Sequence, residues 1–83
     1  MSETQFSFEI NSTAQISVDI FTLGGRRIRR INPQSKSAGY NFINWDGRDE
    51  YGDILANGVY LYRLKATNSN ESVSTIGKIA KYQ

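Results

Sequence analysis

The sequence predicts an all-β fold in which six to seven short strands form two packed antiparallel sheets. Two observations support this prediction. Apolar and polar residues alternate with a period of two, and breaks of Gly, Asn, Asp and Ser recur about every eight to twelve residues. At 83 residues the chain is long enough for one domain with one hydrophobic core. We therefore expect residues 1–83 to form a single β-sandwich domain.

The first two predicted strands cover residues 4–10 and 14–22. Both alternate clearly, and the apolar side chains expected to face the interior are Phe6, Phe8, Ile10, Ile16, Val18 and Ile20. The polar residues between them, among them Asp19, are expected to point outward. Gly24 and Gly25 then predict a two-residue hairpin, because glycine adopts the positive φ angles of a primed turn without strain.

The third predicted strand, residues 26–31, is short and strongly basic. Ile28 and Ile31 cannot both point inward in a regular strand, which predicts a bulge or an edge position. Pro33 is expected to end this strand, because proline has no N–H group for the ladder.

The fourth predicted strand, residues 39–45, is expected to bury Ile43 and Trp45, and Trp45 is the best core anchor in the sequence. Residues 46–58 form a long irregular segment rich in Asp and Gly. The remaining predicted strands cover residues 59–67 and 72–82.

The composition argues against catalysis. The chain has no histidine and no cysteine, so the commonest general base and zinc ligand and any thiolate or disulfide chemistry are missing. The net charge of +2, from 10 basic and 8 acidic residues, gives no strong field toward nucleic acid or anionic lipid. The sequence also lacks a run of about 18 apolar residues and an N-terminal secretory signal. We expect no enzymatic activity, no cofactor and no direct insertion into a membrane.

Two charged clusters each allow two interpretations. Acidic residues gather in the irregular segment at Asp46, Asp49, Glu50 and Asp53. Hard cations such as calcium prefer several carboxylate oxygens, but Asp before Gly more often builds a turn. The turn interpretation is preferred, and calcium binding by residues 46–53 stays open.

The basic cluster consists of Arg26, Arg27, Arg29, Arg30 and Lys36. Single-stranded nucleic acid could bind there if tyrosines supplied stacking faces, the candidates being Tyr40, Tyr51, Tyr60 and Tyr62. The preferred interpretation is an edge strand whose charges prevent pairing with other molecules, and no nucleic-acid partner is expected.

Three segments carry a family resemblance. The most specific one reads NWDGRD at residues 44–49, then Gly52, then LANGVYLYRL at residues 55–64. It resembles the C-terminal sorting domains of bacterial type IX secretion cargo and the related Ig-like domain of the flagellar hook-capping protein. Residues 20–26 resemble the strand–turn segment of this family, and residues 78–81 resemble its short basic–apolar ending.

The resemblance implies a small immunoglobulin-like antiparallel β-sandwich that acts as a secretion signal. It also implies export through the periplasm to the outer-membrane surface or the medium, with the type IX translocon and its sortase as protein partners. An Ig-like structural or adhesive module of a surface or flagellar protein is the alternative.

Recognition of a folded signal requires exposed, rigid residues. The residues that we assign to recognition are Gly24, Gly25, Arg26, Lys78, Ile79 and Lys81. The motif residues that we assign to the fold are Trp45, Asp46, Gly47, Gly58, Val59 and Tyr60. Removing residues 78–83 is therefore expected to abolish export while altering the rest of the fold less.

Overall fold

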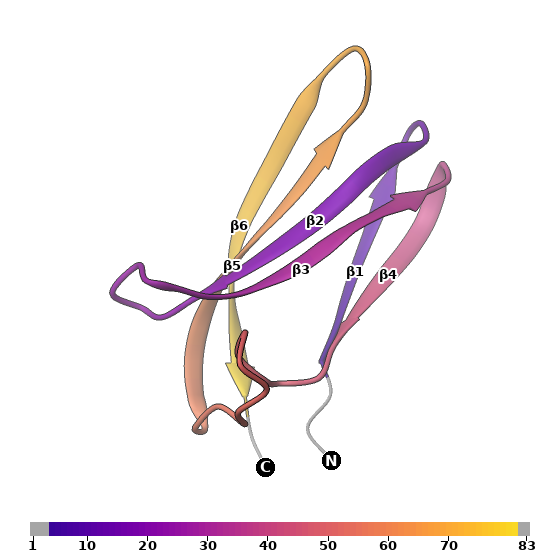
Figure 1. Cartoon of the computed structure of the whole chain (residues 1–83). Coiled ribbons are helices and arrows are strands. Elements are labelled where there is room, and N and C mark those ends of the chain that lie inside the picture. Colours follow the sequence, from indigo (N-terminus) through magenta and orange to yellow (C-terminus); the bar gives the residue numbers. More distant parts are fainter. Residues whose placement is uncertain (1–3, 82–83) are drawn as a thin grey trace.

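The computed structural model describes residues 4–81. This part of the chain contains six β-strands in two sheets, joined by turns and loops (Figure 1). The strands are β1 (Thr4–Ile10), β2 (Ala14–Phe21), β3 (Arg27–Lys36), β4 (Gly39–Trp45), β5 (Gly58–Thr67) and β6 (Ser72–Lys81). One sheet pairs β1 with β4, and the other has the order β3-β2-β5-β6. Every pairing is antiparallel. The predicted all-β sandwich is confirmed, with the strand number inside the predicted range.

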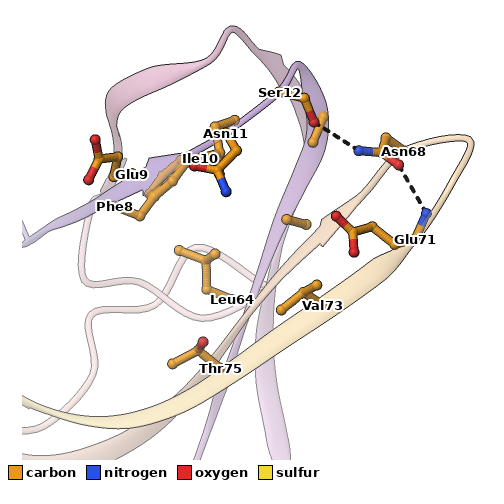
Figure 2. A pocket seen from close by; sticks show the side chains of 12 residues that line it. Phe8, Glu9, Ile10, Asn11, Ser12, Leu64, Asn68, Glu71, Val73 and Thr75 are labelled. Atoms are coloured by element: carbon orange, nitrogen blue, oxygen red, sulfur yellow. Dashed lines mark hydrogen bonds between the residues drawn. The ribbon is translucent and has the colours of Figure 1, made fainter.

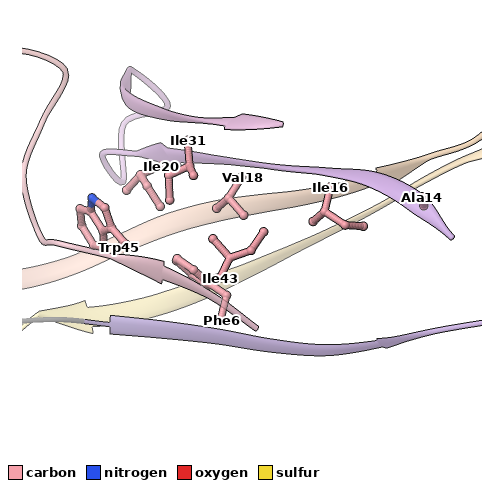
Figure 3. Close-up of a cluster of buried hydrophobic side chains, with 8 residues drawn as sticks. All are labelled: Phe6, Ala14, Ile16, Val18, Ile20, Ile31, Ile43 and Trp45. Atoms are coloured by element: carbon pink, nitrogen blue, oxygen red, sulfur yellow. The ribbon is translucent and has the colours of Figure 1, made fainter. Parts of the chain in front are cut away.

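The core lies between the two sheets and is centred on β2. Ile16, Val18 and Ile20 are each 0% exposed, because their alternate positions place all three on the inner face of the larger sheet. Ile43 and Trp45 of β4 meet them from the opposite sheet, as Figure 3 shows. The inward face that the sequence predicted for these residues is therefore confirmed.

Strand β3 is an edge strand with two irregularities. Its register against β2 shifts between Ile16 and Val18 and again between Ile20 and Phe21, which is the signature of bulges. The second shift allows Ile28 to pack against the core although Ile31 is already buried there. The two isoleucines predicted a bulge or an edge position, and the structure has both.

The prediction that Pro33 ends this strand is wrong. Strand β3 continues through Pro33 to Lys36. The first register shift lies opposite the segment that contains Pro33, so its missing N–H group falls where the ladder is already interrupted. An edge strand with a bulge tolerates proline for that reason.

A close contact between β5 and β6 depends on Gly77. Gly77 lies opposite Tyr62 in the register, and a Cβ atom at Gly77 would come within 2.6 Å of the Tyr62 ring. The same ring packs against Phe6 of β1, at 4.9 Å between ring centroids. Tyr62 thus connects the two sheets in a space that only a glycine on β6 leaves open.

Candidate interaction surfaces

The turn between β2 and β3 differs in type from the prediction. Thr22 closes the loop by donating its N–H to the Arg26 carbonyl and by accepting from the Gly25 N–H, both at 2.9 Å. Leu23, Gly24 and Gly25 lie between, so the loop has three residues instead of two. Only Gly25 has a positive φ, at 95°, as in a three-residue hairpin that ends in a left-handed residue.

Thr22 stabilises this turn with its side chain as well. Its Oγ1 atom accepts a hydrogen bond from the Arg26 N–H at 3.2 Å. Gly24, Gly25 and Arg26 are all exposed. The structure therefore places this part of the predicted recognition surface in contact with solvent, on a turn with defined backbone hydrogen bonds.

The other predicted recognition residues, on β6, do not share one exposed face. Lys78 is exposed, but Ile79 packs against the core and Lys81 is only 2% exposed. The assignment of Ile79 and Lys81 to an exposed surface is wrong, because the strand alternates and both residues face the inner side. The expectation that the terminus is separable from the fold loses its basis for the same reason.

The acidic segment after β4 is built from turns. The Asp46 carboxylate accepts a hydrogen bond from the Arg48 N–H at 3.0 Å. The Asp49 carboxylate accepts from the N–H groups of Tyr51 and Asp53, at 2.9 and 3.0 Å. These contacts confirm the turn-building role that was predicted for Asp residues in this segment.

Trp45 joins this segment to the core. Its ring is 1% exposed, and its indole N–H donates to the Arg48 carbonyl at 3.0 Å. Arg29 of β3 reaches the same loop, donating to the Asp46 carboxylate at 3.0 Å and to the Arg48 carbonyl at 2.9 Å. The loop after the tryptophan is therefore held by the core on one side and by the edge strand on the other.

The remaining motif residues divide between fold and surface. Gly47 is buried with a φ of 78°, a conformation that favours glycine. The Tyr60 ring meets the Trp45 ring edge to face at 6.5 Å, and its hydroxyl donates to the Ala56 carbonyl at 2.6 Å. Val59 is 44% exposed on the outer face, so its side chain is not a core residue. Gly58 begins β5 opposite Lys81.

A buried carboxylate on β2 organises the outer face of the larger sheet. Asp19 points outward as predicted, but it is only 4% exposed. In the register it lies between Arg30 of β3 and Arg63 of β5, and each guanidinium donates to one carboxylate oxygen at 2.9 Å. Arg27 adds a weaker contact at 3.9 Å. Asp19 is buried on an outer face because arginines on both neighbouring strands cover it.

The charges around Asp19 also change its acidity. Burial by itself raises the pKa of the Asp19 carboxyl, but the hydrogen bonds and charges of Arg30 and Arg63 outweigh it and leave the pKa below its ordinary value. The same carboxylate raises the pKa of Arg30. Asp19 is thus an ionised group at neutral pH that neutralises part of a cationic surface.

The four tyrosines do not gather on one surface. Tyr60 and Tyr62 face the interior, where both pack against the core. Tyr40 belongs to the other sheet, and Tyr51 is in the acidic loop. The arrangement of stacking rings beside a basic groove, which single-stranded nucleic acid would need, is not formed by these residues.

A groove of about 270 Å³ opens between the end of β1 and the β5–β6 hairpin (Figure 2). Its floor is apolar, with Phe8, Leu64 and Val73 among its lining residues. At its rim the Asn68 side chain donates to the Ser12 hydroxyl at 3.2 Å and accepts from the Glu71 N–H at 3.0 Å.

Within residues 4–81, no group of three or more acidic, histidine or cysteine side chains is arranged to hold a metal ion. The same residues contain no helix of the length and hydrophobicity needed to cross a membrane.

Comparisons with known proteins point to one family. The model of the FlgD Ig-like domain family matches residues 1–70. No curated protein matches the chain. Among solved structures, FlgD from P. aeruginosa is similar, with a TM-score of 0.78 and 20% identity over 95% of this chain and 61% of that one. The hook-capping FlgD from Xanthomonas campestris matches with a TM-score of 0.73 and 21% identity, over 98% of this chain and 56% of that one.

A much longer protein contains a similar domain. Dimeric latent PorU from Porphyromonas gingivalis matches with a TM-score of 0.75 and 22% identity, over 95% of this chain but only 8% of that one. The chain thus spans less than two thirds of the length of each of these three proteins. At these identities the three likenesses show a common fold.

Proposed function

The chain belongs to the FlgD Ig-like domain family, and from this membership we propose that it is a non-catalytic structural module of a larger protein, one that makes protein contacts in a flagellar or cell-surface assembly. The observation that carries the proposal is the family match over residues 1–70, supported by the fold that the chain shares with two FlgD proteins. One of those is a hook-capping protein of flagellar assembly.

The architecture suits such a role. A rigid sandwich with one core presents turns and sheet faces in fixed positions, which is what repeated protein–protein assembly requires. The absence of histidine and cysteine from the sequence leaves the domain without the commonest general base and without a thiol nucleophile. We therefore assign contact surfaces to it and no reaction.

The test is an in-frame deletion of the segment that encodes residues 1–83 in the bacterium that carries the gene. We expect hooks and filaments to be lost in electron micrographs and swimming to stop. A parent protein with Trp45→Ala, whose core is destabilised, should behave like the deletion, and the wild-type gene should restore assembly. Normal hooks in the deletion strain would contradict the flagellar form of the proposal.

A sorting domain for type IX secretion is the second candidate. It is favoured by the sequence block at residues 44–64 and supported by the PorU likeness, in which the fold is a small part of a very long chain. Fusing residues 1–83 behind a signal peptide and a reporter, in a bacterium that has this apparatus, separates the candidates. Export of the reporter to the surface or medium supports sorting, and retention in the periplasm contradicts it.

A further inference from the structure

The cations of the larger sheet are concentrated on its outer face. Asp19, Arg30 and Arg63 share this face because they are direct partners in the register, and alternation then adds Lys65, paired with Ser17, and Lys78, paired with Leu61. Arg27 contacts Asp19 from the edge. We call this surface the basic face and define it as Arg27, Arg30, Arg63, Lys65 and Lys78.

The small net charge of the chain conceals this concentration. At these register positions of the described strands Asp19 is the only acidic residue, and it is covered by the arginines. Other acidic residues lie at Glu9 on β1, at Glu71 beyond β5 and in the loop at residues 46–53, which borders the basic face where Glu50 accepts a hydrogen bond from the Arg30 N–H. The outer face itself therefore carries a local excess of cations that the total of +2 does not reveal.

The arginines of the basic face are held in position and are still accessible. Asp19 binds Arg30 through Nε and Arg63 through one terminal nitrogen, so other guanidinium N–H groups of both residues are left for further acceptors. The side chains of Arg27, Arg30 and Arg63 are 46%, 49% and 40% exposed. Fixing them in advance lowers the entropy that binding an anion would cost.

Apolar groups among these cations favour a protein as the partner. Ile76, the register partner of Arg63, is 69% exposed. The Arg63 guanidinium lies 5.6 Å from the centre of the Phe21 ring, and Phe21 is paired with Leu61. Protein interfaces are enriched in arginine together with aromatic and aliphatic side chains. A single-stranded nucleic acid would instead need exposed aromatic rings on this face for its bases to stack on.

We propose that the basic face is a docking surface for an acidic protein surface, in which Asp and Glu side chains pair with Arg27, Arg30 and Arg63 while apolar residues cover Ile76 and Leu61. The proposal adds a partner chemistry to the assembly role above and rests on that role for its choice of a protein partner. The test uses the isolated chain in solution and does not depend on the deletion experiment. Peptide binding can therefore fail while the deletion abolishes hook assembly, and peptide binding can succeed while the deletion leaves the hooks normal.

The test measures binding of a labelled peptide of repeating Asp-Leu-Glu by fluorescence anisotropy at low salt. The face variant is Arg27→Glu and the matched control is Lys36→Glu, which lies on the same strand and changes the net charge equally without altering a residue of the basic face. We expect the face variant to lose about tenfold or more in affinity and the control to lose less than about threefold. Equal losses would overturn the proposal, because net charge alone would then explain binding.

Two further measurements complete the test. Amide chemical shifts of the wild-type chain should change on β2, β3 and β5 when the peptide is added, a result that does not depend on any variant folding. Single-stranded DNA and phosphatidylserine vesicles serve as other anionic classes. Tighter binding to either than to the peptide, or shift changes confined to the groove beside β1, would overturn the assignment of an acidic protein partner.

Discussion

Asp19 is the side chain whose role depends most on its neighbours. In the sequence it is a polar residue between two core residues, and the register places it between two arginines that each donate to it at 2.9 Å. A buried carboxylate with two charged donors is stable where an unpaired one would be costly. Its contribution to folding must therefore depend on its ionisation.

The substitution Asp19→Asn is expected to lower the free energy of unfolding by about 1–3 kcal/mol at neutral pH. The expected loss is smaller than for a fully buried ion pair, because the arginines are partly exposed and solvent screens their charges. The pKa of Asp19 is lowered in the folded state, so its stabilisation is fully present above the ordinary Asp range near 4. It is lost as pH falls through the lower folded-state pKa.

Urea denaturation of both proteins between about pH 7 and 2 measures this dependence. The difference between wild type and Asp19→Asn should stay constant down to the ordinary Asp range and shrink below it. Asp53→Asn, at an exposed position of the acidic loop, is the control and should change little. A difference that did not shrink in acid would show that Asp19 contributes through packing alone.

Trp45 is the residue on which the core depends most. Trp45→Ala removes the largest fully buried side chain and its hydrogen bond to the Arg48 carbonyl, so we expect a loss of about 3–5 kcal/mol. Tyr51→Ala is the matched aromatic control, since Tyr51 is 90% exposed and should change stability by less than about 0.5 kcal/mol. Chemical denaturation followed by circular dichroism compares the two, and similar losses would contradict the central role of the indole.

At the scale of elements, the two edge strands of the larger sheet differ. Strand β3 carries arginines, a proline and bulges, which discourage pairing with another chain. Strand β6 fits closely against β5, because Gly77 leaves room for the Tyr62 ring. The arginines and the proline of β3 are visible in the sequence, whereas the close fit at Gly77 requires knowledge of which residues are opposite each other.

The substitution Gly77→Ala is expected to cost about 1–3 kcal/mol, because its Cβ would overlap the Tyr62 ring, which is also packed against Phe6. Gly24→Ala is the control, since its nearest neighbour would be at an ordinary 3.8 Å. In a Tyr62→Ala background the cost of Gly77→Ala should largely disappear, as a double-mutant cycle of thermal melts can show. An unchanged cost in that background would locate the strain elsewhere.

At the scale of the whole molecule, the last strand belongs to the fold. Strand β6 pairs with β5 along its full length, and Ile79 packs against the core opposite Tyr60. Each edge of so small a sandwich carries a large share of the total stability, because a domain of this size has one core and roughly 5–15 kcal/mol in all.

Deleting residues 78–83 should therefore lower the melting temperature clearly, since burial of an isoleucine side chain contributes up to about 1.5–3 kcal/mol. Lys78→Ala, which changes an exposed residue of the same segment, should leave the melting temperature nearly unchanged. Circular dichroism melts compare both with the wild type. A truncated chain with the same melting temperature as the wild type would show that the terminus is separable from the fold.

The sequence by itself determined the fold class, the inward faces of β1, β2 and β4, the central tryptophan and the turn-building acids, because alternation and local turn chemistry depend on near neighbours in the chain. Only the tertiary structure decided that Asp19 is buried, that β3 continues past Pro33, that Ile79 and Lys81 face inward and that the cations gather on one face. Each of these depends on cross-strand register, which joins residues far apart in the sequence and is fixed only when both sheets close over the core.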